Sequence, residues 1–239
     1  MRLLLLSCSL ILFKTGLAQQ VKPDTAFMAL ARKDQVAHYD NLIKGQSRLY
    51  NGTEYHDYLA HNDEHPYFGL DDWSDGSIMY DDEFYDNVQM FYDISRDRVI
   101  TEHILNGAKI ELITEKVSHF TINGHKFVHL IQDPSRVIVS GFHEVLYDGK
   151  TKVYARREKY LRSRAESNAI AYSFEEKNRL YIFKDGKYHA VRSKGSVWDV
   201  FTDKKQDLKP LFNKTKISFK SSREEAIVRI AEQYDALTK

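Results

Sequence analysis

The sequence predicts an α+β fold, in which an antiparallel β-meander or curved sheet packs against an N-terminal helix and C-terminal helices. The first indication is a set of Asn-Gly and Asp-Gly pairs that separate runs rich in Val, Ile, Tyr or Phe. Such pairs tolerate the positive φ angles of two-residue hairpin turns. The second indication is helical periodicity near both ends of the chain. The four pairs are Asn106-Gly107, Asn123-Gly124, Asp148-Gly149 and Asp185-Gly186.

The β-rich region is expected to span residues 76–191. Its runs alternate apolar and polar side chains, as in Lys109-Ile110-Glu111-Leu112-Ile113, which predicts a sheet with one solvated face. No Pro- or Gly-rich linker and no repeat of fixed period interrupts residues 19–239, so one domain is expected there. The candidate strands are Ser77–Tyr80, Phe84–Tyr92, Arg98–Leu105, Lys109–Thr114, His119–Ile122, Lys126–Ile131, Val137–Tyr147, Lys150–Leu161, Ala169–Phe174, Leu180–Phe183 and Tyr188–Val191.

A helix is expected near the start of this domain, within residues 24–45. Asp24 or Thr25 is a suitable N-cap, a partial apolar stripe follows through residue 43, and Gly45 ends the pattern. The stripe predicts an amphipathic helix that covers a sheet.

The last part of the domain, residues 193–239, is expected to be helical. Ser193 or Ser196 is placed to cap a short helix, and Pro210 is expected to break or start a second helix near Lys204–Phe212. Two overlapping capping boxes then predict a helix from about Arg223 to Leu237. The boxes are Ser221-x-x-Glu224 and Ser222-x-x-Glu225.

Residues 1–18 have the order of a secretory signal peptide: a basic start, an apolar run from Leu3 to Phe13 and small residues before a cleavage site at Ala18. The run is short and is followed by Lys14, which favours cleavage over a retained anchor or a lipid on Cys8. Because Cys8 is the only cysteine, cleavage would leave a mature chain without thiol chemistry. After cleavage no membrane-spanning segment is expected to remain. The expected location is the periplasm or the outer membrane.

The charge of the chain is close to neutral in total but unevenly distributed. The formal net charge is +1, which argues against a nucleic-acid partner. Residues 49–95 contain twelve acidic residues and no Lys or Arg, whereas residues 149–220 contain nineteen basic and eight acidic residues. Two interpretations stay open: separate patches for cations and anions, or two segments that lie together and neutralise each other.

Three histidines form the first candidate metal site. His61 and His65 have the H-x-x-E-H spacing of zinc metalloproteases, with Glu64 in the place of the general base. Pro66 follows directly and disfavours a helix there, so a catalytic zinc is not expected. A looser cluster of His56, His61 and His65 stays an alternative to a polar surface loop.

The second candidate metal site is the run from Asp71 to Gly76, which resembles the skeleton of a calcium loop. Asp71 and Asp75 are the candidate ligands, but Trp73 stands where an oxygen ligand is required. The alternative is a turn that leads into the next strand. No nucleophile elbow, phosphate loop or dinucleotide fingerprint occurs, so no cofactor and no catalytic residue is predicted.

Several short runs of the chain form a recognisable set. They are Gln46–Tyr55, His65-Pro66-Tyr67-Phe68, Tyr85-Asp86-Asn87-Val88, Tyr92-Asp93-Ile94, Lys116-Val117-Ser118-His119-Phe120 and Arg223-Glu224-Glu225-Ala226-Ile227. With these runs the chain resembles an uncharacterised family of exported Bacteroidota proteins, and the resemblance extends from about Thr25 to Leu237. The resemblance implies a Gram-negative envelope setting and assigns no catalytic residue.

These observations predict an exported, non-enzymatic envelope protein with a binding or scaffolding role. Its expected partner is another envelope protein, a glycan or a lipid. The alternatives are a periplasmic hydrolase that uses His and carboxylate groups within residues 54–86, and a lipid carrier with a concave sheet.

Overall fold

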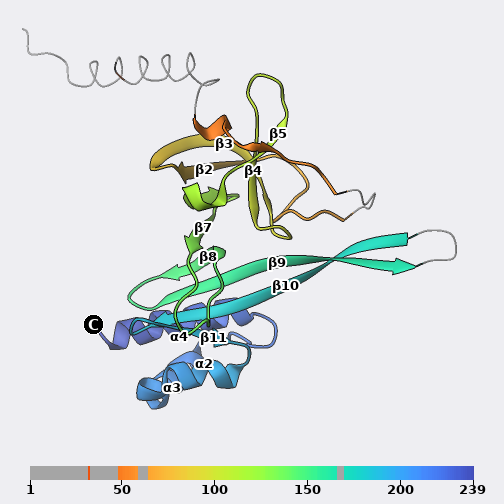
Figure 1. The fold of residues 1–239 in the computed structure, drawn as a ribbon. Coiled ribbons are helices and arrows are strands. Elements are labelled where there is room, and N and C mark those ends of the chain that lie inside the picture. Colours follow the sequence, from red (N-terminus) through yellow and green to blue (C-terminus); the bar gives the residue numbers. More distant parts are fainter. Residues whose placement is uncertain (1–31, 33–47, 59–63, 166–169) are drawn as a thin grey trace, which may run out of the picture. The chain divides into compact units, whose positions relative to one another are not determined.

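The computed structural model describes residues 32, 48–58, 64–165 and 170–239 (Figure 1). The chain divides into two compact units, residues 1–44 and 45–239, and the second contains the β-rich region and the helical end. The predicted signal peptide and the predicted helix at 24–45 lie outside the described residues, apart from residue 32.

The described residues form one sheet of eleven strands in the order β1-β5-β4-β3-β2-β6-β7-β8-β9-β10-β11, and every neighbouring pair is antiparallel. From β6 to β11 each strand pairs with the next in sequence, which confirms the predicted antiparallel meander. The strands are β1 Thr53–Glu54, β2 Ser74–Tyr80, β3 Glu83–Asp93, β4 Arg98–Glu102, β5 Lys109–Glu111, β6 Val117–Ile122, β7 His125–Leu130, β8 Gly141–Asp148, β9 Lys152–Ala165, β10 Ile170–Lys184 and β11 Lys187–Val191.

Two of the four predicted turns have the expected geometry. Asn123-Gly124 joins β6 to β7 and Asp185-Gly186 joins β10 to β11, and both residues of each pair have φ between 50° and 78°. Positive φ at both positions is the type I′ turn that matches the twist of a hairpin.

The other two predicted two-residue turns are wrong. The loop at Asn106-Gly107 is wider, because β4 ends at Glu102 and the His103 carbonyl accepts a hydrogen bond from the Gly107 N–H. The loop after Asp148 runs through Gly149 to β9. It is held by the buried Asp235 carboxylate of the C-terminal helix, which accepts the Thr151 N–H at 2.9 Å.

The structure contains one tight turn and one long strand that the sequence did not predict. Asp81 and Asp82 join β2 to β3 with φ of 53° and 63°; Asp is common at the first of these positions, whereas the second usually holds Gly. The separate strands predicted at Ala169–Phe174 and Leu180–Phe183 are parts of the single strand β10, which β9 accompanies from Ile170 to Phe183.

Three α-helices follow the sheet: α2 Lys194–Val200, α3 Lys205–Lys214 and α4 Arg223–Leu237. Ser193 caps α2 and forms a reciprocal capping box with Ser196, as predicted in part. Pro210 lies inside α3 and does not break it, since Leu208 and Phe212 on either side are buried in the core. Residue 223 starts α4 as expected.

The predicted capping boxes of α4 do not form. Ser222 is the N-cap but makes no side-chain capping hydrogen bond. The Glu224 carboxylate instead binds Arg157 of β9 through two hydrogen bonds, of 2.6 and 2.9 Å. The Glu224 carboxylate therefore takes part in a tertiary ion pair and not in a local capping hydrogen bond. None of the described helices is long and apolar enough to cross a membrane.

The helices bury one face of the C-terminal strands (Figure 1). Ala155 of β9, Leu180 and Ile182 of β10 and Val191 of β11 pack in one apolar cluster with α2, α3 and α4. A second cluster, which includes Tyr92, Phe120, Phe127 and Phe142, fills the β2–β8 part of the sheet. The helices therefore leave the opposite face of the C-terminal strands uncovered.

Candidate anion-binding site

The structure describes two of the three histidines of the first candidate metal site, His56 and His65. His65 Nδ1 accepts a hydrogen bond from the Tyr67 N–H at 3.2 Å, and its ring stacks on the Tyr67 ring with centroids 5.9 Å apart. His56 contributes its backbone carbonyl, which accepts from Arg96 Nη1 at 2.7 Å. His61 lies outside the described residues. Among described residues, no group of three or more His, Cys, Asp or Glu side chains is placed to hold a metal ion.

The two candidate calcium ligands, Asp71 and Asp75, lie close to the start of β2. The Asp75 carboxylate, on β2, accepts a hydrogen bond from the Gln89 side chain on the neighbouring strand β3. Asp72 accepts from the Trp73 N–H at 2.8 Å. Asp71 is exposed in a bend before β2. The calcium site and the turn both stay predictions.

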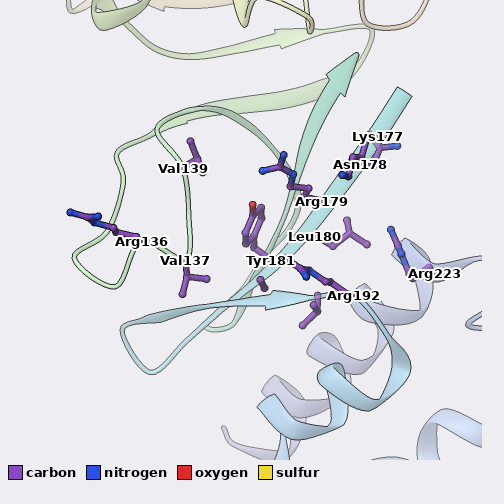
Figure 2. A pocket seen from close by; sticks show the side chains of 12 residues that line it. Arg136, Val137, Val139, Lys177, Asn178, Arg179, Leu180, Tyr181, Arg192 and Arg223 are labelled. Carbon is purple, nitrogen blue, oxygen red and sulfur yellow. The ribbon is translucent and has the colours of Figure 1, made fainter. Parts of the chain in front are cut away.

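A cavity of about 630 Å³ opens beside the end of β11 (Figure 2). It is formed by residues of the β7–β8 loop, of β10, of β11 and of the start of α4. Ligand sites commonly have volumes of about 300–1,000 Å³, so this one is large enough for a small organic molecule. Its lining residues are Arg136, Val137, Val139, Lys177, Asn178, Arg179, Leu180, Tyr181, Ala190, Val191, Arg192 and Arg223.

The β7–β8 loop is held in place by its own polar contacts and by one apolar anchor. The Asp133 carboxylate accepts the N–H groups of Ser135 and Ile138, at 3.2 and 3.0 Å. Ile138 is fully buried. The two neighbours of Ile138, Val137 and Val139, line the cavity rather than the core.

The floor of the cavity is apolar and largely buried. Leu180, Tyr181 and Val191 are 2–3% exposed. Leu180 is paired with Val191 across the β10–β11 ladder, and Tyr181 is paired with Ala190. Because successive strand residues point to opposite faces, lining by both Leu180 and Tyr181 shows that the cavity reaches around the sheet edge where β11 ends.

Among the described residues that line the cavity, five are basic and none is Asp or Glu. Arg179 has partners: the Glu158 carboxylate at 3.0 Å and the Tyr160 hydroxyl at 3.0 Å. Within the described ranges, the other four basic groups have no carboxylate within 4.0 Å. These four, which we call the unpaired cations, are Arg136, Lys177, Arg192 and Arg223.

Two ionisable groups at the floor of the cavity are uncharged at physiological pH. Burial raises the pKa of the Tyr181 phenol, which therefore stays neutral. The His143 ring packs edge-on against Tyr181 with centroids 5.7 Å apart, and burial lowers its pKa to about 4. Because the Glu158 carboxylate, 3.0 Å from Arg179, balances that guanidinium, the net positive charge of the cavity comes from the four unpaired cations.

This site was not predicted from the sequence, although one signal pointed toward it. The basic surplus of residues 149–220 contains Lys177, Arg179 and Arg192. Arg136 and Arg223 lie outside that segment, and only the fold brings them to the same cavity. The acidic and basic segments also meet elsewhere, since Lys159 Nζ donates to two backbone carbonyls of the acidic segment at 2.9 Å. The two interpretations of the charge pattern both stay open.

Comparisons with protein-family models, with curated proteins and with solved structures found no match. The cavity and the charges around it are therefore the features from which a function can be inferred.

Proposed function

We propose that the protein is a binding protein whose cavity takes a ligand with an anionic group attached to an apolar body. The observation that carries this proposal is that four unpaired cations and a buried apolar floor line one cavity, with no carboxylate among its described lining residues. Guanidinium groups bind carboxylate, phosphate and sulfate groups through strong charge-assisted hydrogen bonds. An apolar floor adds affinity in proportion to the ligand surface removed from water.

This chemistry narrows the expected classes of partner. A neutral glycan offers neither an anion nor an extended apolar surface, so it matches the cavity poorly. An acidic lipid and the acidic end of a protein chain each offer both. Three of the carboxylates within residues 54–86 accept hydrogen bonds from neighbouring residues, which favours a structural role for them over hydrolysis; they are Asp57, Asp72 and Asp75.

Export belongs to the same proposal but rests on residues 1–18 alone. In this proposal the signal peptide is removed after Ala18 and binding takes place in the cell envelope. Sequencing of the N-terminus of the protein from its native envelope fraction tests this part. An intact Met1 terminus in a cytoplasmic fraction would contradict it.

Binding is tested with two fluorescent probes of similar aromatic body, anionic 1-anilinonaphthalene-8-sulfonate and neutral N-phenyl-1-naphthylamine. The double variant Arg192→Gln/Arg223→Gln is expected to bind the anionic probe about tenfold or more weakly, because two charge-assisted contacts are lost. The matched control is Lys209→Gln/Lys214→Gln, which removes the same charge from exposed residues of α3 that do not line the cavity.

The control separates a site from a general charge effect. The proposal predicts that the control keeps wild-type affinity and that the neutral probe does not respond to either double variant. An equal loss in both double variants would show that net charge alone attracts the probe, and the proposal would then be wrong.

A further inference from the structure

The strand that lines the cavity has an unpaired edge next to it. β9 pairs with β10 from Ile170 to Phe183, whereas β11 pairs only with Leu180–Lys184. On the β11 side, no other described strand pairs with the part of β10 before Leu180. The cavity lies where this ladder stops, since Leu180 and Val191 form its last pair and both line the cavity.

The backbone groups on this edge point away from β9. Phe174 donates its N–H to the Glu64 carboxylate rather than to β9. In an antiparallel strand, alternate residues direct both the N–H and the C=O to the same side. Glu176 and Asn178 share the parity of Phe174, so their N–H and C=O groups also face outward. They have no backbone partner on that side among the described residues.

The edge is short and closed at both ends. Glu64 occupies the N–H of Phe174, and β11 occupies the edge from Leu180 onward. Six residue steps of extended chain span about 20 Å, which leaves room for a segment of about four residues. A chain that pairs with Glu176 and Asn178 therefore meets the end of β11 and has to stop or turn there.

We propose that the ligand is the C-terminal segment of an extended peptide, which pairs with the outer edge of β10 and places its terminal carboxylate among the unpaired cations. This inference rests on the proposed anion-binding function and adds the class of ligand. A chain end fits this place because Val191 occupies the next position along the edge and ends the pairing there. The charge selects the carboxyl end, because a terminal ammonium group would be repelled by Arg192 and Arg223.

The direction of the peptide is set by these placements. β10 runs from Ile170 toward the cavity and onward to Lys184. A peptide whose carboxyl end reaches the cavity therefore runs parallel to β10. Strand addition of this kind gives affinity through backbone hydrogen bonds, and specificity through the terminal carboxylate.

The first test uses two pools of short acetylated peptides with randomised final residues, one with free C-terminal carboxylates and one with C-terminal amides. Retention of each pool on the immobilised full-length protein is measured by mass spectrometry. The best-retained carboxylate peptide is then labelled and titrated. The amide of the same sequence is expected to bind about tenfold or more weakly, because the charge-assisted contacts are lost.

The second test separates the edge from the cavity. Glu176 does not line the cavity, and its N–H faces outward, so Glu176→Pro removes an edge donor while the pairing with β9 is kept. Glu176→Gln is the matched control, because it makes the same charge change and keeps the N–H. Peptide affinity is expected to fall about tenfold in Glu176→Pro alone, whereas binding of 1-anilinonaphthalene-8-sulfonate stays unchanged.

The outcomes distinguish this inference from the function on which it rests. Binding of the anionic probe that depends on Arg192 and Arg223, with equal retention of the carboxylate and amide pools, would overturn the peptide inference and leave the anion site intact. If binding of the anionic probe does not depend on Arg192 and Arg223, both the anion-binding function and the peptide inference would be wrong. Dimerisation of the protein that Glu176→Pro abolishes would show that a second copy pairs with the edge, and would also overturn the inference. If Glu176→Pro unfolds the protein, the peptide inference is tested with Arg192→Gln/Arg223→Gln instead. This double variant is expected to lose the preference for the carboxylate peptide over the amide of the same sequence, and an unchanged preference would overturn the inference.

Discussion

The variant Arg157→Met is expected to destabilise the protein strongly, because Arg157 neutralises a buried carboxylate. Arg157 of β9 lies between Glu144 of β8 and Glu224 of α4, at 2.5 and 2.6 Å. The side chains of Glu144 and Arg157 are only 4% and 10% exposed. Methionine keeps the apolar stem of the side chain but leaves the Glu144 carboxylate with the His125 imidazole as its remaining side-chain partner in these contacts.

The expected loss is about 3–5 kcal/mol of unfolding free energy, the cost of breaking a buried ion pair from one side. For a domain of this size, that loss corresponds to a fall in Tm of roughly 6–20 °C. Urea denaturation followed by far-UV circular dichroism measures the free energy, and a thermal scan measures Tm.

A matched control and a double variant make the reasoning refutable. Arg162→Met makes the same change on the same strand, but Arg162 and Glu175 are 62% and 59% exposed, so a loss below about 1 kcal/mol is expected. The double variant Glu144→Leu/Arg157→Met removes both buried charges and is expected to recover most of the stability. A loss in Arg157→Met no larger than in Arg162→Met would refute the account of Glu144 as a buried charge that needs its partner.

Three further predictions concern backbone strain and acid stability. Asp82→Gly, which places Asp-Gly at φ of 53° and 63° and keeps the Asp81 ion pairs, is expected to stabilise the protein by about 1 kcal/mol in urea denaturation; a loss of stability would contradict the turn assignment. Gly141→Ala is expected to cost at least about 2 kcal/mol, because φ is +132° and a Cβ would overlap the Arg156 and Asp97 side chains; a neutral effect would be inconsistent with their close approach. Burial lowers the pKa of His143 to about 4 from a usual 6.5, so the unfolded chain binds one more proton between these values. Stability is therefore fully present above pH 6.5 and is lost, by up to about 3 kcal/mol, as the pH falls to 4. His143→Gln should flatten this part of the pH profile, and an unchanged profile would show that other groups cause it.

Features specified by local chemistry were predictable from the sequence. Asn123-Gly124 and Asp185-Gly186 form the expected turns because both residues of each pair tolerate positive φ. Ser193 caps α2 as the local pattern indicates. The helix predicted from about Arg223 to Leu237 was confirmed with those bounds, because its apolar side chains recur with helical spacing.

Features specified by distant partners were not predictable. The polar stretch from Glu175 to Arg179 resembles a loop by itself, but pairing with β9 makes it the middle of β10. Glu224 was expected to complete a capping box, but the Arg157 guanidinium competes for it and forms two hydrogen bonds. Asp82 stands where a two-residue hairpin turn usually has Gly. The pairing of β2 with β3 holds Asp81 and Asp82 at positive φ.

The sequence by itself determined an antiparallel meander followed by helices, because turn propensity and hydrophobic periodicity act over a few neighbouring residues. It also supplied the prediction of export and the excess of basic residues. Only the tertiary structure decided where that charge is concentrated. Arg136, Arg179, Arg192 and Arg223 belong to four separate segments, which one cavity brings together. The edge of β10 likewise depends on where β11 ends and α2 begins, so its unpaired backbone groups result from strand pairing and not from residue type.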